Sequence, residues 1–100
     1  MQINNEQYSP FHYNFPAYQG GSRTDGSCAN KIVEEAKEYA EELENGNAYD
    51  ALIELLDTIH ACETMLRRYD EDVVLRAKID VLRKNMNRGY YSEYDTARIW

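Results

Sequence analysis

The sequence predicts an all-α protein, a short helical bundle completed by homodimerisation, with an irregular N-terminal arm. Two observations carry this prediction. From residue 30 to residue 91, apolar side chains recur at spacings of three and four, which is the period of an amphipathic helix. Only five glycines and two prolines occur in the 100 residues, and most of them lie near the start of the chain. Few residues therefore interrupt the helical part.

The arm comprises residues 1–29, where no helical or strand period survives. Pro10, Pro16 and the Gly20-Gly21 pair break regular structure there. A polar composition of this kind is typical of a disordered tail. The arm is nevertheless rich in aromatic rings, which are Tyr8, Phe11, Tyr13, Phe15 and Tyr18. The rings favour an arm that packs on a partner subunit or covers a site, and both interpretations stay open.

The first helix is expected to begin at an N-cap, Asn30, and to stop at Asn45-Gly46. Gly46 suits the left-handed position that commonly follows a helix. Asn47 is the candidate N-cap of the second helix, whose apolar residues occupy nearly two faces. Its apolar residues are Ala48, Ala51, Leu52, Leu55, Leu56, Ile59, Cys62, Met65 and Leu66.

A turn at residues 69–72 precedes the third helix, which is expected to end near Gly89. The tail, residues 92–100, has no clear period. Three helices form a thin core, because domains of this size bury only a modest fraction of their surface. The wide apolar face of the second helix therefore predicts that a second copy covers it, in a homodimer or a dimer of dimers.

The formal net charge of −7 excludes several classes of partner. Nucleic-acid binding needs a stripe of Lys and Arg, and anionic membranes attract basic surfaces, so we expect neither partner. No apolar stretch reaches the roughly 18–20 residues that span a bilayer, and the start of the chain does not resemble a secretory signal. Cys28 and Cys62 have no metal-ligand spacing. We therefore expect a cytoplasmic, reduced protein.

The acidic residues are concentrated in the first two helices. Residues 30–60 hold nine acids and two lysines, whereas residues 61–100 hold seven acids and eight bases. Glu35 and Glu38 are three residues apart, and so are Glu54 and Asp57, which places each pair on one helical face. The short turn makes the two helices antiparallel neighbours, so the two pairs are expected at a similar height.

Glu54 and Asp57 are the more informative pair, because they interrupt the apolar segment "ALIELLDTIHA" at residues 51–61. Acidic side chains are almost never fully buried without a partner. Two like charges 4 Å apart repel by about 4 kcal/mol at an effective dielectric constant of 20. Four converging carboxylates therefore need cations, and a hard divalent ion with oxygen ligands meets that need. The pattern predicts Mg²⁺, or alternatively Mn²⁺, and a phosphorylated substrate. Solvated surface acids remain the simpler explanation for any single pair.

These motifs also resemble a known family. The sequence "EEAKE" at residues 34–38 is followed after fifteen residues by "ELLD" at residues 54–57. Together they resemble the E-E-x-x-E … E-x-x-D signature of MazG-like nucleotide pyrophosphohydrolases, in the all-α NTP pyrophosphatase superfamily that includes the phosphoribosyl-ATP pyrophosphohydrolases. "DTIHACETML" resembles the continuation of the second motif, and "KNMNRGYY" resembles the ending of small, often phage-encoded members. The resemblance covers residues 30–91.

The resemblance implies hydrolysis of a nucleoside triphosphate between the α and β phosphates. It implies that the metal ligands are Glu35, Glu38, Glu54 and Asp57. Glu34 would be an auxiliary acid, which binds a second ion or orients water, and either Glu34 or Glu38 would hold the attacking water. Bound metal ions would screen the polyphosphate and lower the pKa of water.

Basic and polar residues of the third helix are the candidates for phosphate binding. The resemblance favours Lys84 and Arg88, with Asn85 and Lys78 as further candidates. The alternative interpretation is structural: basic side chains near the C-terminus of a helix stabilise it by complementing the helix dipole. His60, one turn beyond Asp57, would contact the nucleotide or a metal ligand, or would be an ordinary histidine at the bundle seam.

Larger members of the family have a helix before the first motif that helps to form the nucleobase pocket, and this chain has the arm there. Base selection therefore stays open, and another phosphoanhydride remains an alternative substrate. Functions of another class also remain: a non-catalytic helical interaction protein, or a protein that binds nucleotide without hydrolysing it.

Overall fold

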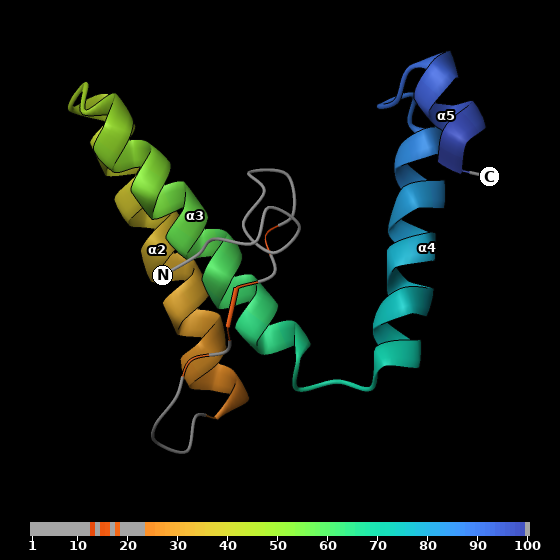
Figure 1. Cartoon of the computed structure of the whole chain (residues 1–100). Helices are drawn as coiled ribbons and strands as arrows, with labels where there is room; N and C mark the ends of the chain where they lie inside the picture. The colour runs from red at the N-terminus through yellow and green to blue at the C-terminus, as the bar shows by residue number, and fades with distance from the viewer. Residues whose placement is uncertain (1–12, 14, 17, 19–23, 100) are drawn as a thin grey trace, which may run out of the picture. The chain divides into compact units, whose positions relative to one another are not determined.

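The computed structural model describes residues 13, 15, 16, 18 and 24–99, with side-chain environments up to residue 96. The chain divides into two compact units, Met1–Arg68 and Tyr69–Trp100, each of which is described by itself. Every regular element in the described ranges is an α-helix (Figure 1). This confirms the all-α class. None of these helices combines the length and the apolar character that crossing a membrane requires.

The first described helix, α2, spans Asp25–Glu44, and its N-cap lies six residues before the predicted one. Its N-cap is Thr24, whose hydroxyl oxygen accepts a hydrogen bond from the Ser27 backbone N–H at 3.1 Å. The prediction that Asn30 caps this helix was therefore wrong. Apolar periodicity starts only at Ile32, whereas the capping hydroxyl and Asp25 in the first turn set the helix start independently of any apolar face.

A tight turn joins α2 to α3, which spans Ala48–Leu66. Gly46 has a φ of +78°, and its N–H donates to the Leu43 carbonyl, so the predicted left-handed stop is confirmed. Asn47 occupies the predicted N-cap position but makes no capping hydrogen bond. Its side-chain amide instead donates to Glu42 at 2.9 Å across the turn.

Helices α2 and α3 pack along their lengths as an antiparallel hairpin (Figure 1). The apolar residues buried between them are small ones, Cys28, Ala51 and Ala61, which are at most 5% exposed. Small residues allow two helix backbones to approach closely, and they add little apolar area. Larger apolar side chains of the hairpin remain exposed, including Val33, Leu43, Tyr49, Leu52, Ile53, Leu55 and Leu66.

The second unit contains α4, Glu71–Asn87, and α5, Glu93–Ile99. Gly89 has a φ of +73° and follows the C-cap Arg88, as predicted for the end of this helix. The tail, which shows no clear period in the sequence, forms α5 instead. Its start is fixed by Ser92, whose hydroxyl donates to Asp95 at 2.8 Å and accepts from the Asp95 N–H at 3.1 Å. No described residue of α4 is buried.

Candidate metal centre

Three carboxylates of the hairpin converge. Glu35 and Glu38 lie three residues apart on α2, and Glu54 reaches them from α3. One oxygen from each of the three side chains lies within 4.8 Å of the others. The short turn and the small residues of the interface bring these acids to the same height of the hairpin. The arrangement offers three oxygen donors from two helices, which is a donor set that hard divalent cations accept.

Glu35 is the most deeply placed of the three acids, at 5% exposure. Its Oε1 lies 2.6 Å from Nζ of Lys31, one helical turn earlier on α2. This hydrogen bond lowers the pKa of the Glu35 carboxyl, against the opposing effect of burial. The same hydrogen bond is the main cause of the raised pKa of Lys31. Glu35 is therefore held in its ionised form.

The pKa of the Glu54 carboxyl is shifted in the opposite direction to that of Glu35. Its pKa is raised from an ordinary 4.5 to about 7, first by burial and then by the neighbouring carboxylates of Glu38 and Glu35. Its Oε2 atom is inaccessible to solvent and has no hydrogen-bond partner among the described residues. A buried oxygen without a partner is unfavourable, and a cation bound at this place would remove the penalty. The residues present therefore fit a divalent metal ion.

The structure does not bring the fourth predicted ligand into this cluster. Asp57 is half-buried on α3 and is not one of the three residues whose oxygens converge. It lies three residues beyond Glu54, which turns it about 60° around the helix, and its side chain is one methylene shorter. Glu34, the predicted auxiliary acid, is exposed on α2. The hydrolytic role of Glu34 and the ligand role of Asp57 stay predictions.

His60 contacts the arm. Its ring stacks on Phe15, with centroids 5.0 Å apart, and on Tyr18, with centroids 4.1 Å apart. Nε2 of His60 lies 2.8 Å from the Pro16 carbonyl oxygen. Phe15, Pro16 and Tyr18 of the arm thus lie against α3 of their own chain. The predicted contact of His60 with nucleotide is not tested by this arrangement.

Glu63 of α3 and Arg67, the C-cap residue of this helix, bind the arm backbone. The N–H of Phe15 donates to Oε1 of Glu63 at 2.8 Å, and its carbonyl accepts from the guanidinium of Arg67. Glu63 and Arg67 are one turn apart on the helix, so both polar groups of one residue are bound by one helical face. Nothing in the sequence pattern indicated this role for either residue.

The predicted phosphate-binding residues lie in the second unit. Lys78, Lys84 and Arg88 are exposed, and Asn85 is half-buried. The guanidinium carbon of Arg88 lies 6.0 Å from the centroid of the Tyr90 ring. The side-chain amide of Asn85 donates to the Tyr91 hydroxyl at 3.4 Å. Their proposed contact with phosphate remains a prediction.

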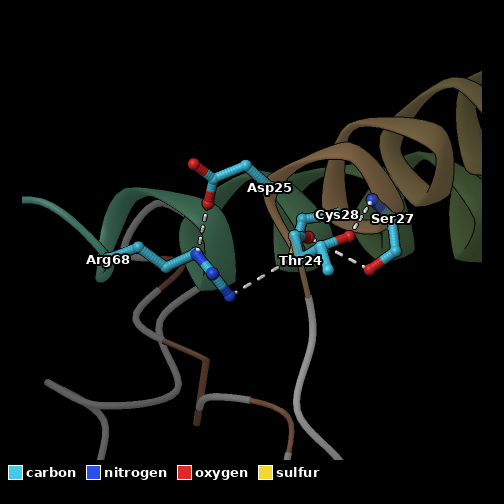
Figure 2. A network of polar contacts seen from close by, with 5 residues as sticks. All are labelled: Thr24, Asp25, Ser27, Cys28 and Arg68. Atoms are coloured by element: carbon cyan, nitrogen blue, oxygen red, sulfur yellow. Dashed lines mark hydrogen bonds and ion pairs between the residues drawn. The ribbon is translucent and has the colours of Figure 1, made fainter.

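A polar network lies at the end of the hairpin opposite the turn (Figure 2). It joins the first turn of α2 to Arg68, which follows the end of α3. Nε of Arg68 donates to Asp25 at 2.9 Å, and its Nη1 lies 3.8 Å from Sγ of Cys28. The ion pair is largely exposed, with Asp25 at 73% exposure, so its contribution to stability is small. The network contains no acid of the cluster.

No family model, curated protein or solved structure matches this chain. The likeness to MazG-like enzymes therefore rests on the motifs alone and stays a prediction. Sequence reasoning missed Lys31 as a partner of the cluster. The signal was available in the i,i+4 spacing of Lys31 and Glu35, which brings two helical side chains together.

Proposed function

We propose that the protein is a divalent-metal-dependent nucleotide pyrophosphohydrolase that uses Mg²⁺, with Mn²⁺ as the alternative ion. Its substrate is a nucleoside triphosphate or a related phosphoanhydride, cleaved between the α and β phosphates. The observation that carries the proposal is the convergence of Glu35, Glu38 and Glu54 from two helices, with one buried Glu54 oxygen that lacks a partner. A helical hairpin that served only as an interaction surface would gain stability from apolar residues at these positions.

The three carboxylates would hold the metal ion, and Asp57 is the fourth candidate ligand from the motif. Such an ion supplies charge neutralisation for the polyphosphate and an acidified water. The chain itself contributes a carboxylate that orients the attacking water and accepts its proton, for which Glu38 or Glu34 is the candidate. Hydrolysis joins the water oxygen to one phosphorus as the anhydride bond breaks, and yields a nucleoside monophosphate and pyrophosphate.

Phosphate binding is assigned to the cations of the second unit. Arg88 offers a planar fork and Lys84 a compact charge, and both suit phosphate oxygens. Lys78 and Asn85 are the further candidates, and His60 is a candidate for contact with the nucleotide. The affinity of these cations for a polyanion follows from their charge, whereas the identity of the base depends on residues outside this set.

We also propose that the working form is a homodimer or a dimer of dimers. The hairpin leaves large apolar side chains exposed, among them Leu52, Ile53 and Leu55 on α3. Large apolar side chains exposed close together on one helix favour an interaction surface, because such surface is the kind that partners cover in soluble proteins. A second copy that packed on α3 would bury these side chains and complete the bundle. Sedimentation velocity that shows only monomer at micromolar concentration would contradict the dimer.

The decisive experiment is a panel of canonical and modified NTPs and dNTPs, with Mg²⁺ or Mn²⁺, in which pyrophosphate release is followed. Release from at least one substrate, abolished by EDTA and restored by excess Mg²⁺, is the expected result. Absence of release from every substrate, with a protein that is helical by circular dichroism, would overturn the catalytic proposal. Metal-dependent nucleotide binding without release would instead support a binding protein, and absence of both would support an interaction protein.

A further inference from the structure

Lys31 is a cation already paired with the carboxylate cluster. Its Nζ lies 2.6 Å from Glu35 Oε1, and the two side chains differ sharply in exposure, at 34% for Lys31 and 7% for Glu35. The ammonium therefore sits at the solvent edge of the cluster and neutralises the acid that lies inside. Lys31, Glu35 and Glu38 are spaced i, i+4 and i+7 on α2, which places all three on one helical stripe.

A divalent ion and the Lys31 ammonium compete for the same carboxylate. An ion bound by Glu35 would take a lone pair of the carboxylate, and carboxylate-to-metal distances are about 2.0–2.6 Å. A dication at that distance repels a neighbouring ammonium, so metal binding weakens the ion pair and favours its opening. Lysine is suited to this change, because its four-carbon stem is flexible and its charge is a compact point. Its partial exposure lets the side chain turn outward without disturbing a packed core.

We infer that Lys31 is a resident counter-ion of the cluster, which the metal ion displaces and which then binds the phosphate chain of the substrate. The inference deepens the proposed function and rests on it for the identity of the substrate. Before metal binds, Lys31 stabilises the buried Glu35 carboxylate. After metal binds, the released ammonium stands one turn from Glu35 and meets the polyphosphate at the edge of the site. One lysine thereby serves both states of the site.

The test compares three variants of the full chain. Lys31→Met removes the charge and keeps the length of the stem, and Lys31→Arg keeps the charge. Lys37→Met is the matched control, because Lys37 is an exposed lysine on the same helix. Two equilibria are measured: Mn²⁺ binding alone, from the electron paramagnetic resonance signal of free Mn²⁺, and calorimetric binding of an α,β-methylene nucleoside triphosphate at saturating Mg²⁺.

The two equilibria are expected to shift in opposite directions in Lys31→Met. Mn²⁺ binds more tightly, by about threefold to tenfold, because a competitor for Glu35 is gone, and the triphosphate analogue binds about tenfold more weakly, a change of about 1.4 kcal/mol. Lys37→Met leaves both constants unchanged, and Lys31→Arg preserves analogue binding. If Lys31 only maintained the structure of the site, its loss would weaken the binding of both Mn²⁺ and the triphosphate analogue.

Any result for Lys31→Met other than opposite shifts overturns the inference, provided that the variant keeps the helicity of the parent. The outcome is separable from the proposed function, because neither measurement needs turnover. A parent protein that binds Mn²⁺ and the analogue but releases no pyrophosphate contradicts hydrolysis, and the comparison of variants then still tests Lys31. A parent protein that binds no Mn²⁺ overturns the metal centre and the inference with it.

Discussion

The hairpin of α2 and α3 and the helix α4 are all amphipathic helices, but they differ in how deeply their side chains are buried. In the hairpin, close packing buries Glu35 and makes one oxygen of Glu54 inaccessible. In α4, no residue is buried, and the basic side chains Lys78 and Lys84 are exposed. Among the described residues, shifted pKa values are found at Lys31, Glu35 and Glu54 of the hairpin.

The difference shows that packing, rather than the number of charges, creates a chemically distinct site. Glu41 and Glu44 are also on α2, yet both are exposed and take no part in the cluster. Burial against a second helix is what raises the pKa of one carboxyl and leaves an oxygen without a partner. A role of the basic residues of α4 in phosphate binding stays a proposal.

The largest expected effect is the loss of the proposed activity when Glu54 is changed. Glu54→Gln keeps the shape of the side chain and removes a charged oxygen donor, so pyrophosphate release should fall by more than about 100-fold, beyond the typical cost of altering an outer partner of a metal ligand. Steady-state rates at saturating Mg²⁺ measure this loss. Glu44→Gln, an exposed acid of α2, is the control and should retain full activity.

Asp57→Asn compares an acid outside the cluster with Glu54, which lies inside it. Because Asp57 lies outside the three converging carboxylates, its loss should cost less activity than the loss of Glu54. An equal loss in the two variants would show that Asp57 joins the cluster in the metal-bound protein. A fully active Glu54→Gln protein would contradict the candidate metal centre.

A smaller effect is expected on stability when the hairpin interface is overpacked. Ala51 is 1% exposed between α2 and α3, whereas Ala77 of α4 is exposed. Ala51→Leu should lower the free energy of unfolding by about 1–3 kcal/mol, the usual cost of forcing added methylenes into a packed interior. Ala77→Leu should change it by less than about 0.5 kcal/mol, as is usual for surface positions. Urea unfolding followed by circular dichroism compares them, and equal losses would contradict the contrast between the two regions.

The smallest expected effect is a pH dependence of stability in metal-free protein. Because the pKa of Glu54 rises from 4.5 to about 7 on folding, the folded state binds this proton more tightly than the unfolded state does. Its contribution to stability is therefore complete below pH 4.5 and is lost as the pH rises through about 7. The lowered pKa of Glu35 changes the stability only below pH 4.5, and the raised pKa of Lys31 changes it only above pH 10.5. Both ranges lie outside the window from pH 4.5 to about 7.

Thermal unfolding in EDTA should accordingly show a falling Tm between pH 5 and pH 8. Glu54→Gln should flatten this dependence, because an amide does not titrate, and excess Mg²⁺ should oppose the fall in the parent protein. A Tm that rises across this range in the parent but not in the Glu54→Gln variant would contradict the raised pKa of Glu54.

Local rules predicted much of the fold and part of the site. The end of α2 at Gly46 and the end of α4 before Gly89 followed from the backbone freedom of glycine. The start of α2 was misplaced, because a capping hydroxyl at Thr24 extends the helix through residues without an apolar period. The contact between Phe15 and α3 was beyond prediction, since backbone hydrogen bonds to Glu63 and Arg67 leave no periodic trace in the sequence.

The sequence by itself determined the helices, the turn between them and the acidic pairs at i,i+3 spacing, because each depends on neighbours within about one helical turn. Only the tertiary structure decided which acids meet: Glu54 joins Glu35 and Glu38, and Asp57 does not. That choice depends on the register between two helices, which the close packing of small residues such as Ala51 and Ala61 sets. The pairing of Glu35 with Lys31 follows from their i,i+4 spacing on α2, and only the burial of Glu35 by tertiary packing makes a cation beside that acid important.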